Sequence, residues 1–143
     1  MTTLIENSIS TRMDKLLQDF AILPEPSDRM AHMIAKGHRW PKMDAIEKTE
    51  ENQIHGCLSR LWIKTTVKDG RFQFRMDAEA SMSKGLAATL CEIYTNATPQ
   101  EIMDTPVDII TPLGTPLSLG RQIAIKNLQE SIRAFAKQQQ DNS

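Results

Sequence analysis

Cysteine is scarce in this chain of 143 residues, which contains only Cys57 and Cys91. Two cysteines are too few for the disulfide framework that holds small secreted domains together, so we expect both to be reduced thiols. Long apolar runs are missing too, because no stretch approaches the roughly 20 consecutive apolar residues of a membrane-spanning helix. The first residues also lack the basic-then-apolar order of a secretion signal. These absences predict a cytoplasmic protein with no membrane partner.

An excess of charge of one sign is absent as well. The 17 Lys and Arg against 18 Asp and Glu leave a formal net charge of −1 at pH 7. That balance disfavours an extended phosphate-binding surface, and therefore a nucleic-acid partner. The six glycines are scattered, so the chain has no glycine-rich loop of the kind that binds nucleotide phosphates.

The length and composition favour one folded domain. The 40% hydrophobic and 24% charged residues are ordinary for a globular protein, and 143 residues lie near the commonest domain size. We assign this domain to residues 1–138 and a frayed C-terminal tail to residues 139–143. No long apolar heptad is evident in the sequence, so we expect a monomer.

Hydrophobic periodicity predicts helices on both sides of a short β-hairpin. Apolar residues at helical spacing predict a first helix within residues 4–20 and a second helix that ends at Lys36-Gly37. Alternating residues on both sides of Lys68-Asp69-Gly70 predict a hairpin over residues 58–77. Further helices are predicted over residues 81–96, from Pro99 onward, and over residues 120–138. This order indicates an α+β fold with helices packed on a small, mainly antiparallel sheet, for which residues 53–57 and 107–110 are candidate third strands.

Cys57 is the strongest candidate for chemistry, and it directly precedes the first predicted strand. A thiol reacts as the thiolate, whose pKa falls where cations and backbone amides surround it, and His55 and Arg60 are near enough in sequence to supply positive charge. The plainer interpretation is that Cys57 is a small buried hydrophobe. His55 and Cys57 together provide too few ligands for a zinc site, so no metal is expected. Cys91 lies among apolar residues of a predicted helix and is interpreted as a core residue.

Four blocks of the sequence follow one another in a recognisable pattern. The first is Gly56-Cys57-x-Ser59-x-Leu61-Trp62, and the second is Asp77-x-Glu79-Ala80 followed by Gly85-Leu86. The third is Thr98-Pro99-x-Glu101-Ile102, and the fourth is Leu117-Ser118-x-x-Arg121 at the start of the last predicted helix. In order and spacing these blocks resemble the SufE-like family, sulfur acceptors that assist cysteine desulfurases in iron–sulfur cluster assembly.

The resemblance implies that Cys57 is the acceptor thiol. It would take sulfur as a persulfide from a cysteine desulfurase that depends on pyridoxal phosphate, and pass it to an iron–sulfur scaffold or another downstream acceptor. The family likeness further implies the α+β fold already inferred, no cofactor bound by the chain itself, stimulation of the desulfurase, and an accessory protein rather than a stand-alone enzyme.

The resemblance also suggests roles for four neighbours of the thiol. Arg121 would stabilise a thiolate or persulfide anion, and Asp77 and Glu79 would position the reactive segment or face the desulfurase. His55 would tune the thiol. The plainer interpretations are a surface ion pair for Arg121 and a solvated helix entry for the two carboxylates.

Two other functions remain open from the sequence. The chain would act as an allosteric activator or regulator of a desulfurase if it carried no sulfur itself. It would act as a peroxide-sensing thiol if a second, resolving cysteine lay nearby. The position of Cys91 in an apolar helix disfavours the second of these functions.

Overall fold

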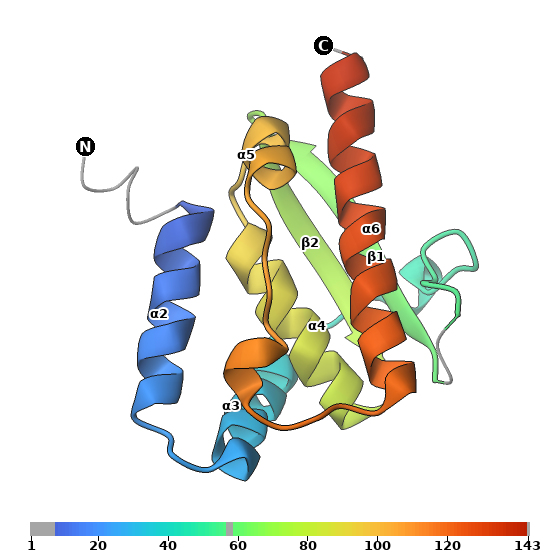
Figure 1. The fold of residues 1–143 in the computed structure, drawn as a ribbon. Coiled ribbons are helices and arrows are strands. Elements are labelled where there is room, and N and C mark those ends of the chain that lie inside the picture. Colours follow the sequence, from blue (N-terminus) through green and yellow to red (C-terminus); the bar gives the residue numbers. More distant parts are fainter. Residues whose placement is uncertain (1–7, 57–58, 143) are drawn as a thin grey trace.

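Five α-helices and a two-stranded antiparallel sheet make up most of residues 8–56 and 59–142, the part of the chain that the computed structural model describes (Figure 1). The elements are α2 Ile9–Ala21, α3 Pro26–Arg39, β1 Leu61–Lys68, β2 Arg71–Ala78, α4 Ser81–Tyr94, α5 Pro99–Asp104 and α6 Leu119–Asp141, with 3-10 helical turns over Ala45–Glu47 and Thr111–Leu113. The predicted α+β class, with helices packed on a small antiparallel sheet, is confirmed. Within these residues no helix has the length and apolar character needed to cross a membrane.

The hairpin forms where the alternating pattern predicted it. Asp69 and Gly70 have φ angles of 54° and 75°, which are the left-handed conformations of a two-residue turn that matches the twist of its strands. The pairing runs from Lys68 opposite Arg71 to Leu61 opposite Ala78. The two candidate third strands do not form in the described residues: Gln53 makes a single bridge to Trp62, and residues 107–110 are irregular.

One face of the hairpin packs against helices α4 and α6 (Figure 1). Phe72, Phe74 and Met76 alternate along β2 with more exposed residues and are buried, as a half-buried strand requires. The ring of Phe72 meets Phe135 of α6 edge-on at a centroid distance of 5.4 Å. Helices α2 and α3 pack in turn against α4. Because other elements cover most of its surface, α4 is apolar nearly all round.

Helix α3 continues past the glycine at which its end was predicted. It runs to Arg39, and Gly37 lies buried at the crossing with α4. A Cβ at Gly37 would lie 2.9 Å from the backbone N of Gly85, and a Cβ at Gly85 would lie 2.7 Å from the carbonyl of Met33. The predicted stop at Lys36-Gly37 is therefore wrong, because this glycine allows two helices to approach closely rather than ending one.

The starts of α2, α5 and α6 are each fixed by a hydroxyl side chain that caps the helix. The Thr98 hydroxyl accepts the Glu101 N–H at 3.2 Å and donates to the Glu101 carboxylate at 3.1 Å, so Thr98 is the N-cap at the predicted start of α5. Helix α6 begins one residue earlier than predicted and extends to Asp141, so it includes residues 139–141, which were assigned to the frayed tail.

Cys91 lies in the core, as the sequence predicted. Its side chain is fully buried on α4, and this burial raises the pKa of the thiol. A thiol that is both inaccessible and protonated is a poor nucleophile, and it is equally unsuited to resolve an oxidised cysteine elsewhere.

Candidate functional site

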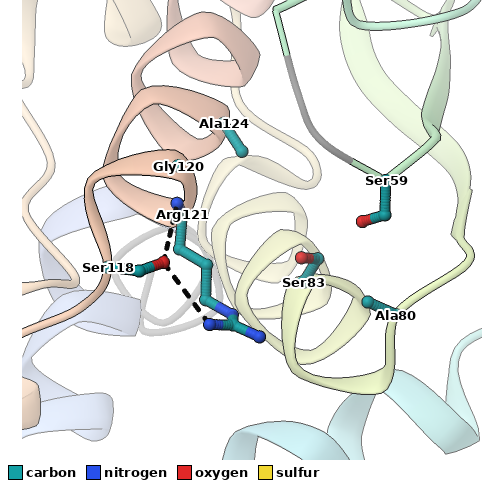
Figure 2. A pocket seen from close by; sticks show the side chains of 7 residues that line it. All are labelled: Ser59, Ala80, Ser83, Ser118, Gly120, Arg121 and Ala124. Atoms are coloured by element: carbon teal, nitrogen blue, oxygen red, sulfur yellow. Dashed lines mark hydrogen bonds between the residues drawn. The ribbon is translucent and has the colours of Figure 1, made fainter.

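A cavity of about 290 Å³ lies where the starts of α4 and α6 approach the chain just before β1 (Figure 2). It is lined by Ser59, Ala80, Ser83, Ser118, Gly120, Arg121 and Ala124. The lining thus combines three hydroxyl groups and one guanidinium with small side chains. Figure 2 shows Ser59 on one side of this space and Arg121 on the other, with Ser83 between them.

Arg121 is the cation of this cavity, and the first turn of α6 positions it. Ser118 caps the helix: its hydroxyl accepts the Arg121 backbone N–H at 3.3 Å and lies 3.4 Å from a terminal guanidinium nitrogen. The Nε of Arg121 is buried and has no hydrogen-bond partner among the described residues. No carboxylate in that part of the chain pairs with it. The guanidinium therefore has unused capacity to bind an anion.

Glu79 holds the chain on the C-terminal side of position 58. Its carboxylate accepts the Arg60 backbone N–H at 2.7 Å and the Arg60 Nε at 3.2 Å, while its own N–H donates to the Arg60 carbonyl at 2.9 Å. The bonds from the backbone and side chain of Arg60 lower the pKa of Glu79. The Arg60 guanidinium also lies 5.3 Å from the centre of the Trp62 ring. Its charge is thus engaged by the Glu79 carboxylate and by the Trp62 ring.

Asp77 joins three segments near the same end of the hairpin. It lies within β2, not in a solvated helix entry, and its carboxylate binds Lys48 Nζ at 2.6 Å and Lys84 Nζ at 3.2 Å. Partial burial alone would raise the pKa of Asp77, but hydrogen bonds from Lys48, from the Ala78 N–H and from Lys84 outweigh it and lower the pKa. Asp77 therefore ties the segment before β1 and the start of α4 to the sheet.

The Asp77→Asn substitution is expected to lower the free energy of unfolding by about 1–3 kcal/mol at pH 7, because it removes the charge that both lysines bind. The folded-state pKa of Asp77 is lowered, so its stabilising effect is complete above the unfolded pKa of about 3.9 and is lost as the pH falls through the folded value. Urea unfolding at several pH values should therefore show the two proteins converging below about pH 4. Asp141→Asn, at the exposed end of α6, is the control. A difference that stayed constant down to about pH 2 would contradict this account.

The N-terminal side of the same segment is held by a residue that the sequence did not indicate. The side-chain amide of Asn127, on α6, donates to the His55 carbonyl at 2.8 Å. The His55 residue is exposed, and it contributes to the described structure through this backbone carbonyl. Gly56 follows with a φ of 88°, which favours glycine.

Most of the residues predicted to surround Cys57 thus lie at or near the described chain on both sides of residues 57–58. Arg121 and Ser59 line the same cavity, Glu79 binds Arg60, and the His55 carbonyl is bonded from α6. Asp77 supports the end of the hairpin by its ion pairs. The predicted acceptor Cys57 lies outside the described residues, as does Leu58, although Gly56 and Ser59 on both sides are described.

Comparison with protein families gives one match over most of the chain. The model described as SufE, an Fe-S metabolism associated domain, matches residues 14–136. An uncharacterized SufE-like protein of Rhizobium meliloti is 31% identical over 108 residues, which cover 73% of this chain and 76% of that protein.

A longer relative contains a similar region as a small part of its length. The chloroplastic quinolinate synthase of Arabidopsis thaliana is 29% identical over 127 residues, which cover 88% of this chain but 18% of that protein. The chain therefore spans less than one fifth of that relative.

A solved structure shares the fold. The solution structure of a hypothetical protein from Thermus thermophilus superposes with a TM-score of 0.70 and covers 89% of this chain and 94% of its own. At 18% sequence identity, this likeness concerns the fold alone.

Proposed function

This chain belongs to the SufE family, whose model describes an Fe-S metabolism associated domain, and from that premise we propose that Cys57 accepts sulfur from a cysteine desulfurase and passes it on for iron–sulfur cluster assembly. The chain would act as a carrier and stimulate the desulfurase rather than catalyse a reaction alone. We propose the cytoplasm as its compartment, because the carrier thiol must stay reduced.

The transfer is an exchange at sulfur. The Cys57 thiolate attacks the terminal sulfur of a persulfide held on the desulfurase, and a new S–S bond forms to Cys57. The bond between that sulfur and the desulfurase cysteine breaks, and the desulfurase cysteine leaves as a thiolate, so no oxidant or reductant is consumed. The pyridoxal phosphate that releases sulfur from cysteine belongs to the desulfurase. A second exchange of the same kind hands the sulfur to a scaffold or another acceptor.

The observation that carries this proposal is the uncompensated guanidinium of Arg121 in a cavity that Ser59 also lines. Ser59 is two residues from Cys57 in sequence, so the cation lies close to the chain that carries the thiol. Thiolates and persulfides are anions, and a nearby cation lowers the pKa of a thiol and stabilises its charged form. Hydroxyl groups from Ser59, Ser83 and Ser118 add hydrogen-bond donors to the same cavity.

The experiment that tests the proposal is intact-mass measurement after incubation with a cysteine desulfurase and cysteine. The protein is expected to gain the mass of one sulfur atom, and treatment with a reductant is expected to remove it, since a persulfide is cleaved by thiols. A protein that gains no sulfur from any cysteine desulfurase offered to it would overturn the proposal.

The Arg121→Ala substitution is expected to slow this sulfur gain by about tenfold or more, because a hydrogen bond to a charged group contributes about 1.5–3 kcal/mol. A mass time course measures the rate. Arg121→Lys keeps the positive charge but loses the planar fork of donors, so its rate of sulfur gain should fall between the rates of the original protein and Arg121→Ala. If Arg121→Ala is folded and accepts sulfur at the original rate, the cation has no part in the transfer.

A further inference from the structure

The chain before Cys57 is bonded to the start of β1, the strand that follows Cys57. The Ile54 N–H donates to the Leu61 carbonyl at 2.8 Å, and the Ile63 N–H donates to the Asn52 carbonyl at 2.8 Å. These two bonds join the chain before the segment to the first residues of β1. Residues 55–60 are therefore bounded by a fixed base, and Glu79 holds the C-terminal side of the segment through Arg60.

The N-terminal side has its own contact, and it comes from a different element. Asn127 lies on α6, six residues after Arg121, and its side-chain amide donates to the His55 carbonyl. A Cβ added at Gly56 would lie 2.8 Å from the same amide nitrogen. The contact thus depends on two residues at once, because Asn127 supplies the donor and Gly56 leaves the space that the donor occupies.

We propose that Asn127 is a positioning residue for the sulfur transfer, a role that rests on the proposed function. Its hydrogen bond fixes the position of the His55 carbonyl, one residue before Gly56 and two residues before Cys57. A segment held on both sides loses less conformational entropy when a partner binds it, so anchoring strengthens binding without any new contact to the partner. Helix α6 would then serve the transfer twice, through the cation Arg121 and through the anchor Asn127.

The first test concerns the anchor alone and needs no desulfurase. Asn127→Ala removes a single hydrogen bond, so the exchange rate of the Ile54 amide, measured by NMR, is expected to rise about fivefold. The Phe72 amide of β2, which donates to the Ala97 carbonyl, should keep its rate. Asn142→Ala makes the same change at the exposed end of the same helix and should alter neither amide. An unchanged Ile54 rate in Asn127→Ala would overturn the anchor.

A coupled substitution identifies the contact responsible. Gly56→Ala is expected to displace the Asn127 amide as well as to strain a backbone with a φ of 88°. In the Asn127→Ala background only the backbone strain remains, so Gly56→Ala should raise the Ile54 exchange rate less than it does in the original protein. If the effects of the two substitutions on the logarithm of the Ile54 exchange rate were fully additive, Gly56 and Asn127 would act separately, contrary to the proposal.

The second test measures sulfur transfer from a cysteine desulfurase at several concentrations of the carrier. Asn127→Ala is expected to raise KM for the carrier about fivefold with kcat unchanged, because the anchor prepares the segment for binding and touches no reacting atom. Asn142→Ala should match the original protein. An unchanged KM despite faster Ile54 exchange would reduce Asn127 to a structural role. If the original protein gains no sulfur, the proposed function fails, whereas the exchange experiment still decides whether the anchor exists.

Discussion

Replacing Cys57 with serine is expected to abolish sulfur uptake, with the rate falling by more than about a hundredfold. A serine hydroxyl is almost fully protonated at neutral pH, and the described residues that line the cavity include no general base to activate it. The thiolate is the group that attacks a sulfur–sulfur bond. Intact mass after incubation with a cysteine desulfurase and cysteine should therefore show no added sulfur on Cys57→Ser.

The matched control for this substitution is Cys91→Ala. Cys91 is fully buried and burial raises the pKa of its thiol, so the variant should still gain one sulfur atom. The same assay separates a carrier from a pure activator. If Cys57→Ser gains no sulfur yet stimulates the desulfurase fully, the chain activates its partner without carrying sulfur. If Cys57→Ser still gains sulfur, the assignment of the acceptor is wrong.

Local chemistry explains which parts of the fold were predictable. Asp69-Gly70 specifies a tight turn by itself, since both residues tolerate the positive φ that the hairpin requires. Thr98 and Glu101 specify the start of α5, because the bond that caps the helix joins residues three positions apart. In each case the interacting groups are close in sequence, so the pattern contains the whole interaction.

The errors in the predicted fold arise where the partner of a residue is distant in sequence. Gly37 resembles a helix stop because glycine commonly ends helices, yet its neighbour in space is Gly85 on another helix. Gln53 lies in a stretch that was a candidate strand, but in the described residues it makes one bridge to Trp62 and no ladder. Periodicity reports which face of an element is buried and contains no information on what covers it.

In the candidate site, too, the sequence indicated residues within short blocks but not the contacts between residues that are distant in sequence. Cys57 became a candidate because it directly precedes a predicted strand beside residues that could supply positive charge, and Arg121 because it lies in a short block that resembles a known family. Glu79 belongs to such a block too, but its bond to the Arg60 backbone appears only in the structure. Asn127 carried no signal at all, since one asparagine on a polar face of a helix is ordinary. Its contact with His55 joins residues 72 positions apart.

The Gly85→Val substitution is expected to lower the free energy of unfolding by about 3 kcal/mol or more. Even the first added carbon would lie 2.7 Å from the Met33 carbonyl, and backbone atoms cannot rotate away as a flexible side chain can. Helices α3 and α4 would have to separate, which loosens the packing around Met33, a fully buried side chain. Valine gains only part of the helix propensity that alanine would gain over glycine, so propensity does not offset this cost.

Urea or thermal unfolding of Gly85→Val measures this cost, and Ala134→Val is the control, because it adds the same branched side chain at an exposed position of α6. The control should change stability by no more than about 0.5 kcal/mol. The result also bears on the candidate site, since Ser83 in the first turn of α4 and Ala80 at its N-cap line the cavity close to Gly85 in sequence. A displaced α4 would move these residues away from Arg121, so sulfur uptake by any folded Gly85→Val protein should fall with its stability. Wild-type stability in Gly85→Val would show that α3 and α4 tolerate a wider spacing, and that their close contact does not hold the cavity in place.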